Sequence, residues 1–139
     1  PPRDFLDALE DLRQYEGNGY EGVMVEYVDP TTGQATFPTM TFFAQMLRPD
    51  EATLPLRQNA SLIYTVIEGS GHSIIDGKRF DWERFDTFCV PGGNWCEHVN
   101  ETPDGDAILF ISSDEPVLKA MRFYMKHGRD KGGEVVRLA

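Results

Sequence analysis

Short runs of β-branched and aromatic residues, separated by turn residues, fill the chain between residues 22 and 112. Runs of this kind are typical of strands. The predicted strands cover residues 23–25, 41–47, 62–67, 72–75, 87–90 and 107–112. Between two of them, Asp76 and Gly77 predict a two-residue hairpin turn. Many short strands with no long helix among them predict an all-β fold, either a sandwich or a barrel.

Apolar residues at helical spacing are confined to the two ends of the chain. Asp4 is placed to cap a helix over about residues 4–15. The apolar face of that helix would carry Phe5, Leu9 and Leu12. Asp114 precedes a second predicted helix over about residues 115–126, which Gly128 would end. The tail beyond it is either an extra edge strand or a contact with a partner.

The length and charge of the chain narrow the class of protein. At 139 residues the chain fits one domain with its own core and is too short for two such barrels, so we predict a single domain over residues 1–139. The formal net charge of −10 at pH 7 argues against nucleic acid or an anionic membrane as partner. The sequence has no secretory segment and no membrane-spanning apolar run, which predicts a cytoplasmic protein. It begins with Pro1 rather than Met, and we expect a segment upstream.

The most specific pattern lies between Phe85 and Asn100. Pro91, Gly93 and Asn100 have the spacing Pro-x-Gly, six residues, Asn. This spacing resembles the second motif of the cupin superfamily, which also has a Gly six residues before the Pro and a metal-binding His three residues after the Pro-x-Gly. Phe85 replaces that Gly, and Cys96 replaces the His. The resemblance implies a cupin fold, a double-stranded β-helix or jelly-roll barrel with short flanking helices at both ends.

The first motif of the superfamily has also lost its ligands. Gly69 closes it, which places the Glu of the motif at Leu62. Its His-x-His pair then falls at Leu56 and Gln58, or at Pro55 and Arg57 in the longer spacing of the motif, and neither register has a His. Iron(II), nickel or manganese in an open site needs about three imidazole or carboxylate ligands. Leu offers none, and Gln offers only a neutral oxygen. We therefore predict a metal-free barrel with no catalytic, cofactor-binding or metal-binding residue.

Further segments resemble a cupin domain of the gentisate 1,2-dioxygenases. These segments cover residues 26–33, 37–39, 46–49, 60–71, 80–82 and 113–120. That family carries two barrels on one polypeptide and opens the ring of gentisate with iron(II) and dioxygen, and its relatives act on salicylate or 1-hydroxy-2-naphthoate. The iron usually lies in the amino-terminal barrel on three His, and the carboxy-terminal barrel often lacks ligands.

The resemblance therefore implies the carboxy-terminal barrel of such an enzyme, with a structural role. The expected partners are the amino-terminal cupin domain of the same parent chain, which would hold the Fe(II), and further copies in a homo-oligomer. One alternative is a stand-alone metal-free cupin that binds a small organic ligand. Another is a metal site with unusual ligands from Cys96, His98 and Gln58.

Strand alternation places the former ligand positions on the inner face of the barrel. The candidate cavity residues are Leu56, Gln58, Leu62, Tyr64, Cys96 and His98. They line either a filled core or a pocket that a small aromatic acid could enter. His98 is either a hydrogen-bonded structural residue or an acid–base group, and with Cys96 it could form a thiolate pair. Cys89 and Cys96 are expected to be free thiols.

The same parity places residues on the outer face. Arg57 and Trp95 are predicted to point outward, with Trp95 over an apolar patch or against another subunit. Trp82 is expected to pack a hairpin against the barrel. His72 and His127 are expected to lie on the surface.

Overall fold

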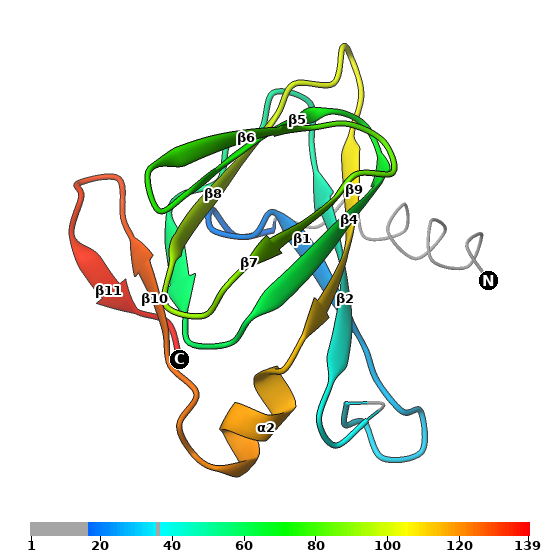
Figure 1. Ribbon diagram of the computed structural model, residues 1–139, viewed down its shortest axis with the longest axis vertical. Coiled ribbons are helices and arrows are strands. Elements are labelled where there is room, and N and C mark those ends of the chain that lie inside the picture. Colours follow the sequence, from blue (N-terminus) through cyan, green and yellow to red (C-terminus); the bar gives the residue numbers. More distant parts are fainter. Residues whose placement is uncertain (1–16, 36) are drawn as a thin grey trace.

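The strands predicted from the sequence are present in the computed structural model, which describes residues 17–35 and 37–139. The strands are β1 Val23–Tyr27, β2 Thr41–Leu47, β3 Leu56–Gln58, β4 Leu62–Glu68, β5 Gly71–Ile75, β6 Lys78–Trp82, β7 Thr87–Val90, β8 Trp95–Asn100, β9 Ala107–Ser113, β10 Lys126–Arg129 and β11 Val135–Arg137. They form a five-stranded sheet of order β1-β2-β9-β4-β7 and a six-stranded sheet of order β11-β10-β3-β8-β5-β6 (Figure 1). All pairings are antiparallel. The predicted all-β barrel is confirmed.

Alternation along the strands builds the core between the two sheets. Every second residue of β5 and of β8 is buried, and the inward residues of β4 and β9 meet them. Trp82, at the end of β6, is 4% exposed and belongs to the same hydrophobic cluster. The expectation that Trp82 packs its hairpin against the barrel is therefore confirmed. Burial of these side chains is the main favourable term in folding.

The hairpin turn between β5 and β6 also has the predicted form. Asp76 has a φ of +51° and Gly77 a φ of +82°, and Ile75 pairs with Lys78 across the turn. Positive φ at both central residues defines the type I′ turn, whose twist matches that of the flanking strands. The Asp-Gly pair supplies these backbone angles at low cost.

The residues that this chain retains from the second motif stabilise the backbone rather than bind a metal. Gly93 has a φ of +89°, a conformation that side-chain-bearing residues rarely adopt. The buried side-chain amide of Asn100 donates hydrogen bonds to the carbonyls of Leu47, Arg48 and Gly105. Its oxygen accepts one from the N–H of Thr102. These residues are therefore needed by the barrel whether or not it binds a metal.

The second predicted helix is shorter than expected. Helix α2 spans Glu115–Ala120 and lies at one end of the barrel (Figure 1). Arg122 has a φ of +59°, and the N–H of Phe123 donates to the Leu118 carbonyl at 2.8 Å. This is the hydrogen bonding of a Schellman helix end, where the left-handed residue is usually Gly. The prediction that the helix reaches residue 126 was wrong, because Arg in that position carries no sequence sign of a helix end.

The residues beyond α2 return to the sheet. Gly128 lies within β10, between β3 and β11, rather than at a helix end. A Cβ at Gly128 would lie 2.3 Å from the ring of Tyr20, so the packed ring requires Gly there. The chain tail forms the edge strand β11, one of the two alternatives for it.

Two expectations concern helices elsewhere. The helix predicted over about residues 4–15 lies outside the described residues. Within residues 17–35 and 37–139, no helix is long and apolar enough to cross a membrane.

Phe85, at the position of the motif's first Gly, has a φ of +74° and is 70% exposed. Its N–H donates to the Val66 carbonyl at 2.8 Å, which fixes this backbone. A left-handed conformation costs a non-Gly residue about 1–2 kcal/mol. We expect Phe85→Gly to be about 1 kcal/mol more stable than Phe85→Ala, since both lose the ring but only Gly relieves the backbone. Urea unfolding of the two variants measures the difference, and an Ala variant of equal or greater stability would contradict it.

Candidate functional site

A cavity of about 80 Å³ lies between the two sheets. The six candidate residues from the sequence all line it: Leu56, Gln58, Leu62, Tyr64, Cys96 and His98. Leu56 and Cys96 are direct neighbours across β3 and β8. Met24, Phe43 and Ile111 add apolar wall from β1, β2 and β9. Val66, two residues beyond Tyr64 on β4, is fully buried in the hydrophobic core.

The former ligand positions of the first motif do not fit an iron(II) site. Leu56 and Leu62 present hydrocarbon to the cavity. The side-chain oxygen of Gln58 accepts a hydrogen bond from the Tyr124 hydroxyl at 2.9 Å. A site for iron(II) or a similar ion needs imidazole or carboxylate ligands, and these three positions supply neither.

Cys96 and His98 do not form a thiolate pair. Burial, with a smaller effect of the Glu97 carboxylate, raises the pKa of the Cys96 thiol to about 12. Burial also lowers the pKa of the His98 imidazole to about 4. A reactive thiolate–imidazolium pair requires shifts in the opposite directions. At neutral pH the cavity therefore contains a neutral thiol and a neutral imidazole, with Sγ and Nε2 3.7 Å apart.

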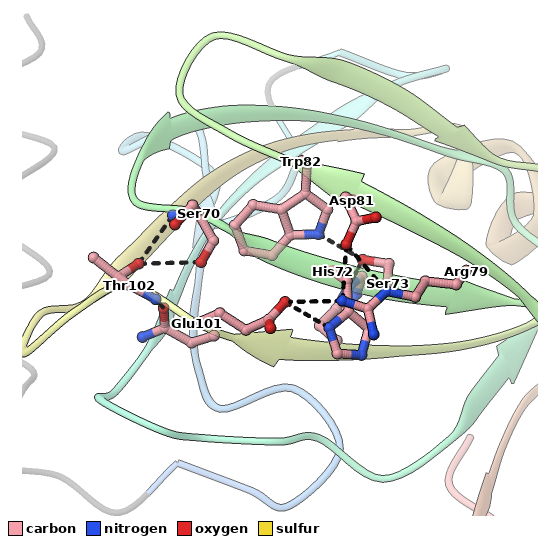
Figure 2. A network of polar contacts seen from close by, with 10 residues as sticks. Ser70, His72, Ser73, Arg79, Asp81, Trp82, Glu101 and Thr102 are labelled. Carbon is pink, nitrogen blue, oxygen red and sulfur yellow. Dashed lines mark hydrogen bonds and ion pairs between the residues drawn. The ribbon is translucent and has the colours of Figure 1, made fainter.

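A buried hydrogen-bond chain fixes which nitrogen of His98 carries the proton. Trp82 Nε1–H, which can only donate, points to the Ser73 hydroxyl at 2.9 Å, as Figure 2 shows. Ser73 Oγ lies 2.6 Å from His98 Nδ1, and Ser73 is fully buried. The Ser73 oxygen can accept two hydrogen bonds, but Nδ1 is the acceptor within reach of its own proton among the described contacts, so we take Ser73 as the donor to Nδ1. We assign the remaining proton of the neutral imidazole to Nε2, on the side that faces Cys96 and Tyr64.

The ring of His98 is also held by packing. It lies 4.9 Å from the ring of Tyr64, which stacks on Phe88. The backbone N–H of His98 donates to the Thr53 hydroxyl at 2.9 Å. His98 is thus a buried, hydrogen-bonded residue of the barrel interior. This agrees with the first of its two alternatives, a hydrogen-bonded structural residue.

Several polar residues of the cavity are absent from the sequence-based set, among them Glu21, Gln45 and Lys126. Glu21 and Lys126 form an ion pair of 2.6 Å beside the cavity. Gln45 is 1% exposed, and its amide nitrogen donates to the Glu21 carbonyl. Its side-chain oxygen has no hydrogen-bond partner among the described residues. A polar residue at an inward position of the apolar run 41–47 could have revealed Gln45, whereas Lys126 was assigned to a helix.

A second polar cluster lies on the outer side of β5. In the described part of the chain, His72, Asp81 and Glu101 place their ligand atoms within 4.8 Å of one another. The guanidinium of Arg79 bonds to Asp81 at 2.9 Å and lies 3.5 Å from Glu101 (Figure 2). Because the guanidinium lies within ion-pair distance of both carboxylates, the cluster is an ion-pair network. His72 lies only 2.7 Å from Glu101, and its side chain is largely covered rather than on the open surface.

Arg57 and Trp95 lie on the outer face, as parity predicts. The guanidinium carbons of Arg57 and Arg129 lie 5.0 and 4.9 Å from the centre of the Trp95 ring. These cation–π contacts cover Trp95 within the chain itself. Neither Cys89 nor Cys96 forms a disulfide, so the expectation of free thiols is met.

The arrangement resembles solved cupin structures. A cupin domain of Cnp3 from Schizosaccharomyces pombe superimposes with a TM-score of 0.57 over 71% of this chain and 68% of that one, at 13% identity, which supports the fold alone. Salicylate 1,2-dioxygenase from Pseudoaminobacter salicylatoxidans, solved as an adduct with gentisate, gives a TM-score of 0.77 at 26% identity. That match covers 94% of this chain and 35% of the other. The chain is a cupin barrel.

Curated proteins narrow the resemblance further. The chain is 40% identical over 131 residues to a gentisate 1,2-dioxygenase from Haloferax sp and 38% identical over 108 residues to a 5-aminosalicylate 1,2-dioxygenase from Comamonas sp. These matches cover 89% and 78% of this chain but only 35% and 28% of the relatives. No family model matches the chain. The chain is therefore a cupin domain similar to the carboxy-terminal part of gentisate 1,2-dioxygenase-type proteins.

The low pKa of His98 predicts a pH dependence of stability. The unfolded imidazole binds a proton near pH 6.5, whereas the folded one binds it only near pH 4. As the pH falls through this window the unfolded state gains the proton first, so stability is lost. The loss from His98 should reach about 3 kcal/mol by pH 4. In urea unfolding between pH 7 and pH 4, the free energy of unfolding should fall more steeply with decreasing pH for the native chain than for His98→Gln. An equal pH dependence in the two proteins would contradict the low pKa of His98.

Proposed function

We propose that this chain is the metal-free, non-catalytic cupin domain of a ring-cleaving dioxygenase that acts on an aromatic acid. In this proposal the iron(II) lies in another cupin domain of the same parent protein, and this barrel alone is inactive. Its role is to stabilise the parent fold and the oligomer, in the cytoplasm. The similarity to about a third of each dioxygenase relative supports a part of a larger enzyme.

The observation that carries the proposal is the donor set of the cavity. Hydrocarbon or a neutral amide stands at each former ligand position of the first motif, and a thiol of raised pKa stands at that of the second. In the tautomer assigned above, His98 turns a protonated nitrogen toward the cavity, and a protonated nitrogen has no lone pair for a metal. This also argues against the third hypothesis, a metal held by Cys96, His98 and Gln58.

An exposed apolar loop supports the contact role. Met121, Phe123 and Met125 are 54%, 60% and 46% exposed in the segment that follows α2. The side chain of Asn59 ties this segment to the barrel, because it donates to the Phe123 carbonyl and accepts from the N–H of Met125. Exposed apolar groups that lie together are typical of protein contacts. In this segment the hydrogen bonds of Asn59 fix the backbone that carries the exposed side chains.

The stand-alone ligand-binding cupin remains a second candidate function. Among the described residues the buried side-chain oxygen of Gln45 has no hydrogen-bond partner, which favours it, because a purely structural core has no need of an unbonded acceptor. The two functions are compatible, since a domain that supports an oligomer can also hold a small molecule.

Metal content and ring cleavage test the proposal directly. We expect the purified chain to retain no stoichiometric iron after incubation with iron(II) and desalting, and to cleave neither gentisate nor salicylate. Elemental analysis and the absorbance of the ring-opened product provide the readouts. Stoichiometric iron, or turnover of either acid by this chain, would overturn the metal-free reading.

A gain-of-binding variant provides the control. Leu56→His, Gln58→His and Cys96→His together should create a nickel or iron(II) site, because all three positions line one cavity. The pair Leu56→His and Gln58→His, without the third change, should bind at least tenfold more weakly, which metal titration measures. Circular dichroism establishes that each variant is folded. Equal binding by both variants would show that Cys96 does not occupy a ligand position.

A further inference from the structure

We propose that the barrel cavity binds a small uncharged molecule with a hydroxyl or amide group, held between the side chains of Gln45 and His98. The proposal goes beyond the structural role above and does not depend on it. It rests on four observations. The side-chain oxygen of Gln45 has no hydrogen-bond partner among the described residues, and Nε2–H of His98 has only weak ones. The other two are the size of the cavity and the charges around it.

Gln45 supplies the acceptor. Its side chain is fixed because the amide nitrogen donates to the Glu21 carbonyl at 2.8 Å. The oxygen on the other side is buried and has no hydrogen-bond partner among the described residues. Gln45 lines the cavity and is 1% exposed. A buried acceptor without a partner is costly, so the site favours a molecule that donates a hydrogen bond.

His98 supplies the donor. The bond from Ser73 to Nδ1 leaves Nε2–H as the group that faces the cavity. Its neighbours there are the Tyr64 oxygen at 3.3 Å and the Cys96 sulfur at 3.7 Å. The Tyr64 contact is longer than a good N–H···O hydrogen bond, and the Cys96 sulfur is only a weak acceptor. Nε2–H can therefore donate to a molecule that offers a better acceptor.

A hydroxyl or a primary amide satisfies both groups at once. Each has a hydrogen for the Gln45 oxygen and an oxygen for Nε2–H of His98. A hydrocarbon satisfies neither group, and a carboxylate cannot donate to Gln45. The pairing therefore selects for a neutral ligand with both functions.

The cavity volume limits the ligand to a few atoms. A cavity of about 150 Å³ admits benzene, and this one has about 80 Å³. A molecule of about four non-hydrogen atoms, such as acetamide or 2-propanol, matches that volume. Gentisate is too large to enter without displacing wall residues such as Leu56 or Ile111.

The charges around the cavity oppose an anion. The carboxylates of Glu21 and Glu115 line it, and each is already paired with a lysine, Lys126 and Lys119 respectively. Among the described lining residues, no cation is left for a ligand carboxylate. Because burial of an unpaired anion is costly, acetate should bind far more weakly than acetamide, its neutral analogue of similar shape.

Titration of the native chain followed by NMR tests the proposal. We expect saturable shifts of the Leu62 and Ile111 methyl groups with acetamide or 2-propanol, with a Kd on the order of 1 mM, a realistic value for so small a ligand. Acetate should bind at least tenfold more weakly. The proposal would be overturned if neither neutral molecule gave a saturable shift at concentrations up to about 100 times that Kd, or if acetate bound equally well.

Two glutamine variants distinguish a cavity that binds its ligand by hydrogen bonds from a cavity that only offers space. Gln45→Leu keeps the shape of the side chain and should weaken acetamide binding about tenfold, the effect of one hydrogen bond. Gln34→Leu is the matched control, because Gln34 is exposed and does not line the cavity, and the change should alter binding less than twofold. Equal effects of the two changes would overturn the role of Gln45. Should Gln45→Leu fail to fold, the comparison of acetamide with acetate on the native chain still decides the question.

Discussion

The hydrogen bond from Ser73 to His98 decides the chemistry of the barrel interior. We assign it this direction because the indole of Trp82 can only donate to the Ser73 oxygen, and because Nδ1 is the acceptor within reach of the Ser73 proton among the described contacts. The chain of three residues makes His98 a fixed, neutral donor toward the cavity. Burial holds the imidazole neutral down to acidic pH. A metal centre would need the opposite, an imidazole whose free lone pair faces the cavity, so the remaining histidine is arranged for hydrogen bonding rather than for coordination.

The motif residues separate into two sets with different physical roles. Gly93 and Asn100 serve the backbone, through a positive φ and through four hydrogen bonds to loop amide and carbonyl groups. The ligand positions serve only a metal, and a side chain such as Leu56 can occupy them without disturbing the turns. Burial of a Leu side chain contributes about 1.5–3 kcal/mol, whereas a buried imidazole without metal must find hydrogen-bond partners. A barrel that no longer binds metal can therefore lose its ligands and keep the rest of its motif.

Strand alternation explains how far the sequence predicted this structure. Period-two patterns placed the six candidate residues on one face, and the structure brings all six to one cavity. The end of α2 was missed because Arg122 takes the left-handed conformation that sequence patterns associate with Gly. Because of that error Lys126 was predicted to lie in a helix, and its ion pair with Glu21 was not predicted. The tautomer of His98 depends on contacts among β5, β6 and β8, which no local pattern contains.

The polar groups of the cavity bear on whether the barrel is only a scaffold. A scaffold is most stable with a filled apolar core, and Phe43, Leu62 and Ile111 line the same cavity as Gln45. An unpaired buried acceptor costs about 1–3 kcal/mol, which Leu at the same position would avoid. The Glu21–Lys126 pair adds two partly buried charges to the same region. Under the proposal above, a molecule that bonds to Gln45 and His98 gives the buried acceptor of Gln45 a function.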